Sequence, residues 1–213
     1  MLGAVLLAAG AGARLGGRPK SLLELDGVSL IRRQIMALRA GGVQQLVVVL
    51  GHHAGLITPV LAGLPVGLVH NPNPGAGPVS SQRLGLAALS GPLSAVIVAL
   101  ADQPLIDADD IAALIAAFQQ RPTGSEVVYP EVMGKRGNPV VFTDHVRQQI
   151  LASAADIGCR QWQAAHAEAV APWATDNRHY KIDIDTPEDL ARFEQDSGQT
   201  LRWPATLTDA RNP

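Results

Sequence analysis

Short apolar runs alternate with segments of helical periodicity along the first half of the chain. The apolar runs are rich in β-branched residues and end at turn residues, as buried parallel strands do. These runs are Val5–Ala9, Leu46–Leu50, Val66–His70 and Val96–Ala101. The helical segments are Ser29–Ala40, His53–Ala62, Ser80–Leu89 and Ala108–Gln119, the last preceded by Asp107 as an N-cap. This order predicts an α/β fold, a doubly wound sandwich in which helices cover a mostly parallel sheet.

The second half of the chain has a less regular pattern. Two predicted strands, Val127–Pro130 and Pro139–Phe142, are joined by a tip at Val132–Asn138. Helices are predicted at Asp144–Ala152 and Gly158–Ala167. The connecting loops are short and no internal repeat is visible, so the pattern indicates no boundary between domains.

The end of the chain combines an acidic segment, a helix and a polar tail. Tyr180–Asp185 alternates apolar and acidic residues and is predicted to be a strand. Thr186 and Pro187 suit the N-cap and first turn of a final helix. After Gly198 no periodicity is evident. We therefore expect one domain over residues 1–197 and a polar tail over 198–213 that is either disordered or docks on a partner.

Composition narrows the class of protein. The 213 residues carry a net charge of −2, which gives no reason to expect nucleic-acid binding. Cys159 is the only cysteine, so no intramolecular disulfide can form, as is usual in a reducing compartment. The sequence has neither a signal-peptide pattern nor an apolar stretch of about 18 residues or more. We expect a cytoplasmic protein that does not enter membranes.

The first predicted strand runs into a glycine-rich basic loop, LLAAGAGARLGGRPK. Glycines let the backbone approach phosphate oxygens and turn N–H groups toward them, and cations balance the phosphate charge. The dinucleotide-binding fingerprint is excluded because Leu15 stands where its third glycine belongs. The nucleotide P-loop is excluded because Arg18 and Pro19 separate Gly17 from Lys20. The loop therefore predicts polyphosphate binding of another kind, and the alternative is an ordinary glycine-rich turn.

Two acidic segments could hold a metal ion near this loop. Asp102 ends the predicted strand Val96–Ala101, at the sheet edge where open α/β sheets bind ligands. A carboxylate beside a polyphosphate is repelled unless a cation lies between them, and Mg²⁺ is the usual one. Asp183 and Asp185 alternate with isoleucines and should share one face of their strand. The alternatives are that Asp102 caps a turn and that the two other acids lie on a solvated edge.

Taken together, these segments resemble the nucleotidyltransferases that attach a nucleoside monophosphate to the molybdenum cofactor. The resemblance spans roughly Val5 to Phe193, and its fold is a Rossmann-like three-layer α/β/α sandwich with a mostly parallel sheet. In the motif ADIGCR, Ala155 and Cys159 depart from the residues expected in this family. The motifs are LAAGAGARLGGRPK at Leu7–Lys20, SSQRLGL at Ser80–Leu86, VALADQP at Val98–Pro104, GNPVVF at Gly137–Phe142, ADIGCR at Ala155–Arg160 and DIDTPEDL at Asp183–Leu190.

The resemblance implies roles for individual residues. Arg14, Lys20 and Asp102 would be catalytic, and Asp102, Asp183 and Asp185 would bind Mg²⁺. Gly137, Asn138 and Arg160 would contact the acceptor. Lys135 and Arg136 would either lie near an anionic acceptor or form a solvated hairpin tip. The nucleotide would contact Leu7, Ala8, Ala9, Gly10, Gly12, Arg14, Lys20, Ser80, Ser81 and Arg83.

The resemblance also implies a reaction. Members that use CTP have the sequence LAAG found here at Leu7–Gly10, whereas members that use GTP have LAGG, so CTP is expected and GTP is less favoured. The acceptor would be the terminal phosphate of molybdopterin or of the molybdenum cofactor, and a molybdoenzyme could receive the product. One alternative is a nucleotidyltransferase for a sugar phosphate or another small phosphorylated acceptor. A second alternative is a binding protein that delivers the cofactor to a molybdoenzyme without turnover.

Overall fold

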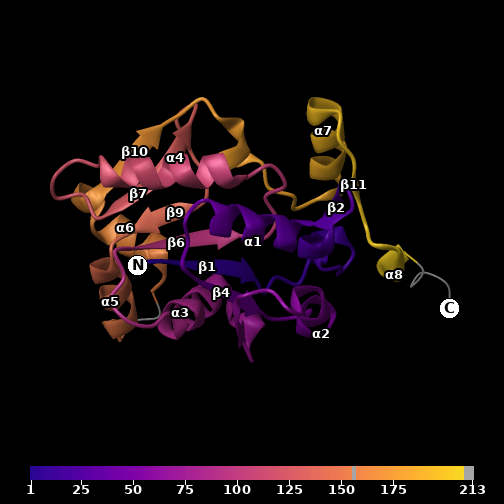
Figure 1. Ribbon diagram of the computed structural model, residues 1–213, viewed down its shortest axis with the longest axis horizontal. Helices are drawn as coiled ribbons and strands as arrows, with labels where there is room; N and C mark the ends of the chain where they lie inside the picture. The colour runs from indigo at the N-terminus through magenta and orange to yellow at the C-terminus, as the bar shows by residue number, and fades with distance from the viewer. Residues whose placement is uncertain (155–156, 209–213) are drawn as a thin grey trace.

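Most of the chain forms one sheet with helices on both faces (Figure 1). The computed structural model describes residues 1–154 and 157–208. Strand β9 is antiparallel to both neighbours, and the other pairs along the sheet are parallel. The predicted α/β sandwich with a mostly parallel sheet is therefore confirmed. The strands in spatial order are β10 (Val170–Ala174), β7 (Val127–Val132), β9 (Val140–Phe142), β6 (Ala95–Leu100), β1 (Leu2–Ala8), β4 (Gln45–Leu50) and β5 (Gly67–His70).

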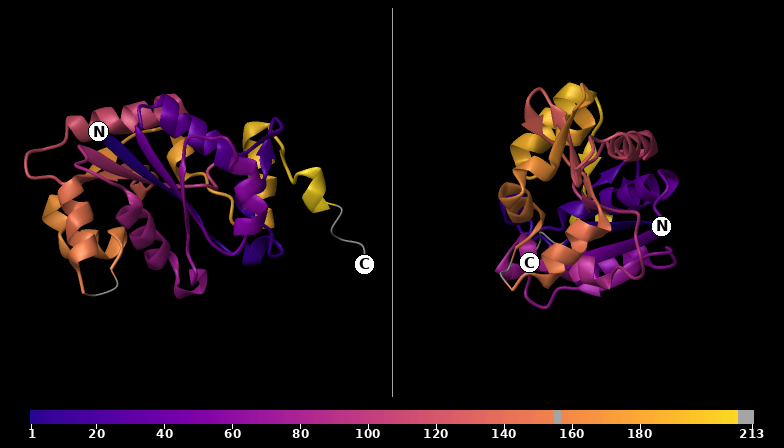
Figure 2. Two further views of the ribbon diagram at one scale, coloured as in Figure 1. Left: turned by 60° about the horizontal axis from the view of Figure 1, so that its bottom comes forward. Right: turned by 90° about the vertical axis from the view of Figure 1, so that its left-hand side faces the viewer.

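The helices divide into two layers around this sheet, and the two further views show them on either side of the strands (Figure 2). Helices α1 (Leu30–Ala40) and α4 (Ala108–Gln119) enclose one hydrophobic core with the sheet. Helices α3 (Pro78–Ala88), α5 (Asp144–Ala152) and α6 (Cys159–Ala165) enclose a second core on the opposite face. Among the described residues, no helix is long and apolar enough to cross a membrane.

A small second sheet and two further helices complete the fold. The small sheet has the antiparallel order β11 (Leu201–Arg202), β2 (Glu24–Leu25) and β3 (Val28–Ser29). Part of the predicted tail therefore pairs with the domain as β11. Helices α7 (Pro187–Ser197) and α8 (Ala205–Thr208) flank β11, and residues 209–213 lie outside the described part.

The predicted helix His53–Ala62 is wrong over its second half. Helix α2 covers only Ala54–Ile57, and a 3₁₀ turn follows at Thr58–Leu61. Pro59 explains the change, because it has no N–H to donate and its ring clashes with the carbonyl four residues earlier.

The predicted strand Tyr180–Asp185 is also wrong. A 3₁₀ turn covers Arg178–Lys181, and the chain then crosses the strand ends without forming a ladder. Its backbone bonds go to two different segments: Asn138 N donates to Tyr180 O at 2.9 Å, and Ile184 N donates to Asp102 O at 3.1 Å. Ile184 is fully buried, so its inward orientation follows the expectation even though the strand does not form.

The predicted tip Val132–Asn138 is shorter than expected. Strand β8 (Lys135–Arg136) pairs antiparallel with the end of β7, and the turn is at Met133 and Gly134. Both turn residues have positive φ, 51° and 71°, as two-residue hairpin turns require. Arg136 is therefore a strand residue with a defined direction.

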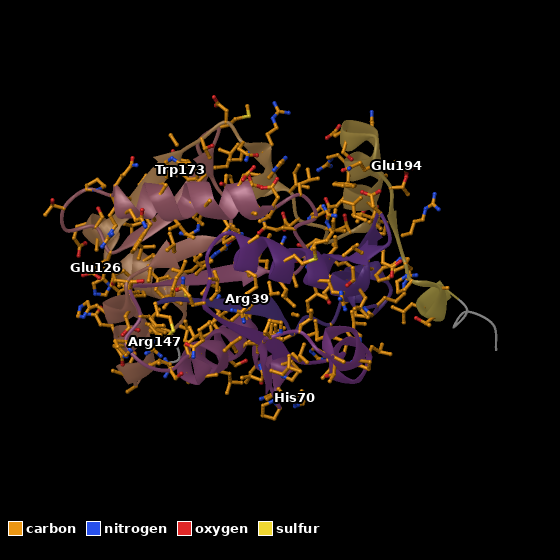
Figure 3. All side chains as sticks on the ribbon, viewed as in Figure 1. Arg39, His70, Glu126, Arg147, Trp173 and Glu194 are labelled. Atoms are coloured by element: carbon orange, nitrogen blue, oxygen red, sulfur yellow. The ribbon has the colours of Figure 1, made fainter. Side chains whose placement is uncertain are left out.

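A buried arginine, Arg147, and a half-buried one, Arg83, link helices α3 and α5 reciprocally (Figure 3 labels Arg147). Arg147 on α5 donates to the carbonyls of Leu86 and Leu89 at the end of α3, both at 3.0 Å. Arg83 on α3 donates to the carbonyls of Leu151, in the last turn of α5, and Ser153, which follows it, both at 3.3 Å. Each guanidinium satisfies carbonyls that a helix end leaves without an intrahelical partner.

Gly85 lets α3 pack directly on the sheet. A Cβ at this position would lie 2.3 Å from Val5 Cγ1 and 2.7 Å from Val49 Cγ2. Both valines are buried strand residues and cannot move far. We therefore expect Gly85→Ala to lower the free energy of unfolding by about 1–3 kcal/mol, and the melting temperature by roughly 2–12 °C.

Gly55→Ala in α2 is the matched control, because a Cβ there meets nothing within 4 Å. Alanine favours helix over glycine, so this control should melt at or slightly above the wild-type temperature. Thermal melts followed by circular dichroism measure both variants. Equal melting of Gly85→Ala and wild type would contradict the close packing of α3.

Candidate active site

A cavity of about 400 Å³ opens at the carboxyl ends of β1 and β6, which are adjacent strands. Its volume lies within the range of small-molecule sites. The loop after β1 forms one wall, the start of α3 forms another, and Lys20 and Asp102 lie at its edge. Its lining residues are Leu7, Ala9, Gly10, Ala11, Lys20, His52, Pro74, Gly77, Pro78, Ser81, Leu100 and Asp102.

The glycine-rich loop has a compact shape that depends on Gly12. Its φ is +63°, and its carbonyl accepts from Leu15 N at 2.8 Å and Gly17 N at 3.0 Å. The loop closes so tightly that a Cβ at Gly12 would lie 1.9 Å from the carbonyl oxygen of Arg18. His53 Nε2 lies 2.9 Å from Ala11 O and fixes the loop to the end of β4.

Four charged side chains meet beside this loop. The Lys20 ammonium forms ion pairs with Asp102 Oδ2 and, at 2.5 Å, with Asp185 Oδ1. Arg14 pairs with the other oxygen of Asp185 at 3.0 Å. The structure thus brings together residues from the β1 loop, the end of β6 and the segment before α7. Two carboxylates occupy two of the three lysine N–H donors, and Lys20 also lines the cavity.

Burial and pairing shift the pKa values of these groups in different directions. Burial disfavours the charged Lys20, but Asp102 and Asp185 outweigh it and raise the pKa of this lysine. Burial raises the pKa of Asp102 in spite of Lys20. Burial also opposes the charge of Asp185, but Lys20 and Arg14 hold its pKa below the ordinary value. The cluster therefore keeps a charged lysine and at least one ionised carboxylate at neutral pH.

Two features of the same residues bear on the binding of a divalent cation. Asp102 Oδ1 is buried and has no hydrogen-bond partner among the described residues. Asp183 is exposed, yet partial desolvation, followed by the charges of Asp102 and Asp185, raises its pKa, so this third carboxyl lies within the field of the other two. Carboxylate oxygens are the donors that Mg²⁺ prefers. A bound cation would reduce the repulsion among these carboxylates and would give Asp102 Oδ1 a partner.

Some predicted site residues lie elsewhere. Arg83 does not line the cavity, because its guanidinium binds the carbonyls after α5. The Oγ atom of Ser80 accepts from Asn71 Nδ2 at 2.9 Å. Asn138 O accepts from Gln103 Nε2 at 3.2 Å, which places Gly137 and Asn138 next to the end of β6. In the motif ADIGCR, residues 155 and 156 lie outside the described part of the chain.

Some uncharged residues that line the cavity were not predicted from the sequence. His52 and Pro74 are two of them. A Cβ at Gly51 would lie 2.8 Å from Ala9 Cβ and 2.9 Å from Pro74 Cβ, so Ala9 is in a confined space. The position of His52 in the sequence could have indicated that it lines the cavity, because it follows a parallel strand, as Asp102 does.

The C-terminal segment contacts the glycine-rich loop. The Arg18 guanidinium lies over the Trp203 ring, 4.2 Å from its centroid. Arg18 Nε also donates to Leu15 O at 3.3 Å, within the loop. Trp203 therefore packs against the segment that Gly12 shapes, and the tail contributes to the surroundings of the site.

Comparison with known proteins identifies the family. A family model described as the MobA-like NTP transferase domain matches residues 4–170. The chain belongs to this family. It is 30% identical over 199 residues to a nicotine blue oxidoreductase of Paenarthrobacter nicotinovorans, a match that covers 89% of this chain and 94% of that protein. The chain spans only 32% of a bifunctional IspD/IspF enzyme of Clavibacter michiganensis, to which it is 36% identical over 129 residues, 58% of this chain.

Solved structures show the same fold. Rv0371c from Mycobacterium tuberculosis has a TM-score of 0.75 at 24% identity, with 91% of this chain and 97% of that chain covered. A nucleotidyl transferase from Methanothermobacter thermautotrophicus has a TM-score of 0.72 at 25% identity, covering 92% and 96%. A second Rv0371c structure, a complex with manganese, has a TM-score of 0.72 at 21% identity, covering 92% and 98%. This MobA-like chain is therefore of the nucleotidyltransferase type.

Proposed function

We propose that this MobA-like protein transfers CMP from CTP to the terminal phosphate of molybdopterin or the molybdenum cofactor and releases pyrophosphate. The observation that carries the proposal is the Lys20 ammonium, which lies between Asp102 and Asp185 at the edge of the cavity beside the glycine-rich loop. The motifs at Gly137–Phe142 and Ala155–Arg160 favour this acceptor among those of related enzymes. A molybdoenzyme that receives the product belongs to the same proposal.

The chain's own residues would act by positioning and charge neutralisation. A phosphate oxygen of the acceptor attacks the α-phosphorus of CTP, and the bond to the bridging oxygen breaks as pyrophosphate leaves with the electron pair. The attacking oxygen is already anionic at neutral pH, so no general base is needed. Arg14 and Lys20 would balance the charge that develops on the phosphates, and backbone N–H groups near Gly10 and Gly12 would orient them.

Asp102, Asp183 and Asp185 would hold Mg²⁺, which when bound supplies positive charge beside the phosphates. The buried, unpartnered Oδ1 of Asp102 supports this assignment. The manganese complex of the mycobacterial protein with the same fold is consistent with a divalent ion.

The preference for CTP rests on Ala9. This residue lines the cavity and is close to Gly51 and Pro74, so its methyl group reduces the space for a base. A pyrimidine needs less space than a purine. Ala9→Gly is the change that would enlarge this space and admit GTP.

Two alternatives have support of their own. The likeness to the IspD/IspF enzyme keeps a smaller phosphorylated acceptor open. The likeness to a nicotine blue oxidoreductase over 94% of its length keeps a redox reaction open. A delivery protein without turnover is less consistent with the paired Lys20, Asp102 and Asp185, because cofactor binding alone does not need a carboxylate beside the phosphate loop.

The deciding experiment measures pyrophosphate release with Mg²⁺ and each of CTP, GTP, ATP and UTP, with and without molybdenum cofactor. Cofactor-dependent release from CTP alone is the expected result. Release from GTP alone would overturn the base assignment and keep the reaction class. Absence of release with every nucleotide, from protein shown to be folded, would overturn the proposed function.

A further inference from the structure

A second cavity, of about 600 Å³, lies over strands β7 and β10 and the start of α6. Tyr129 and Pro172 come from the strands, Arg136 from β8, and Arg160 and Gln163 from α6. Two arginines thus face one hollow whose other walls are apolar or uncharged. No ion pair joins either arginine to an acid within residues 1–154 and 157–208.

Arg136 is held in place without neutralisation of its charge. Its Nη1 donates to Gln163 Oε1, and its guanidinium lies over the Tyr129 ring at 4.4 Å from the centroid. Arg136 Nε and Gln163 Nε2 are buried donors without an acceptor among the described residues. Burial, followed by the charge of Arg160, lowers the pKa of Arg136. Two unneutralised cations that repel each other and have donors in excess are the arrangement that an anion stabilises.

This cavity lies on the same face of the sheet as the nucleotide cavity. Tyr129 contributes to the same hydrophobic core as Leu7, which lines the nucleotide cavity. Only β9 separates β7 from β6, whose last residue Leu100 lines that cavity too. Two to four strand spacings of about 4.8 Å separate the strands that line the two cavities, so the cavities are offset sideways by roughly 10–20 Å.

The segment between the cavities connects Arg136 to the reacting groups. Arg136 O accepts from Lys181 Nζ at 2.9 Å, on the segment that leads to Asp183 and Asp185. Two residues after Arg136, Asn138 O accepts from Gln103 Nε2, beside Asp102. One elongated molecule could therefore reach from the Lys20 cluster to Arg136 across this short segment.

We propose that Arg136 and Arg160, oriented by Tyr129 and Gln163, bind a second anionic group of the acceptor, in the cavity on the other side of this segment from the phosphate that reacts. This inference rests on the proposed function and adds a requirement on the acceptor: it is an elongated molecule with negative charge at both ends. The apolar walls formed by Val170 and Pro172 fit a ring system between or beside those charges.

The test compares Arg136→Gln, Arg160→Gln and the double variant with wild type in the pyrophosphate assay. Each single change should raise KM for molybdenum cofactor about 10- to 100-fold and leave KM for CTP unchanged, because a charged hydrogen bond is lost at the acceptor only. Arg192→Gln is the control, since this arginine is exposed on α7, where it forms an ion pair with Asp189 at 3.9 Å. An unchanged KM for the cofactor in the double variant, with unchanged melting temperature, would overturn the inference.

A binding measurement separates this inference from the proposed function. Equilibrium dialysis at low ionic strength against radiolabelled inorganic phosphate counts the anions bound by wild type and by the double variant. The wild type should bind one more phosphate than the double variant, whether or not CTP proves to be the substrate. Equal binding by the two proteins would overturn the anion site even if the transfer reaction is confirmed.

Discussion

Replacing Asp102 by asparagine is expected to abolish transfer, with a fall in kcat of at least about 100- to 1000-fold, in a protein that stays folded. Asparagine keeps the shape of the side chain but removes its charge, and with it an oxygen donor for a divalent cation. It also removes one of the two carboxylates that orient Lys20. The nucleotide would then lose the divalent cation, and the second positive group beside it, Lys20, would be held less firmly in position.

The pKa of Asp102 predicts how the stability of this variant depends on pH. Because the pKa is raised in the folded protein, folding gains from protonating Asp102. That gain is complete below the ordinary carboxyl pKa and is lost as pH rises through the raised value. At pH 7 asparagine is neutral, so the variant does not carry the cost of burying a charged carboxylate. Asp185 still pairs with Lys20. We expect the variant to have a free energy of unfolding within about 1 kcal/mol of wild type at pH 7. As pH falls, the free energy of unfolding of wild type should rise relative to that of the variant.

The measurements are single-turnover transfer rates and urea unfolding at pH 7 and pH 5. Asp196→Asn is the matched control, because this acid is exposed in the last turn of α7 and should affect neither rate nor stability. A folded Asp102→Asn protein that transfers CMP at a tenth of the wild-type rate or faster would contradict the role of Asp102. Loss of transfer with binding of the cofactor retained would separate catalysis from simple delivery.

Replacing Gly12 by alanine is expected to lower kcat/KM for CTP about 100-fold, because the loop that positions the phosphates could not keep its shape. The added Cβ would lie 1.9 Å from Arg18 O, which is backbone and cannot move without opening the loop. The bonds from Leu15 N and Gly17 N to Gly12 O would be disturbed with it.

Gly17→Ala separates the clash from backbone strain. Gly17 has a φ of +70°, close to the +63° of Gly12, but a Cβ there meets nothing within 4 Å. Both variants therefore carry a similar left-handed strain of about 1–2 kcal/mol, and only Gly12→Ala carries the steric conflict. Steady-state kinetics with varied CTP, together with thermal melts, would measure both. Equal losses in the two variants would show that φ alone, and not the close approach to Arg18, determines the effect.

Local pattern was sufficient for the central strands of the sheet and for the position of the glycine-rich loop. The buried runs that became β1, β4 and β6 were visible because burial on both faces requires continuous apolar residues. The glycines and cations before Lys20 indicated a phosphate loop from their spacing alone, and Asp102 could be placed by the rule that ligands bind at strand ends. The alternation of acidic and apolar residues at Tyr180–Asp185 led to a wrong strand prediction. The same alternation occurs in a segment that crosses the strand ends without pairing along an edge.

What the sequence by itself determined was the α/β class, the glycine-rich basic loop after the first strand and the residue types able to hold a cation, since these follow from short-range periodicity and composition. Only the tertiary structure decided which charges meet. It placed Lys20 between Asp102 and Asp185, used Arg83 to join two helices, and left Arg136 and Arg160 facing a cavity that no acid lines in the described part of the chain. The reason is physical: an arginine or carboxylate has the same local pattern whatever its partner, and the partner is chosen by packing between elements distant in the chain.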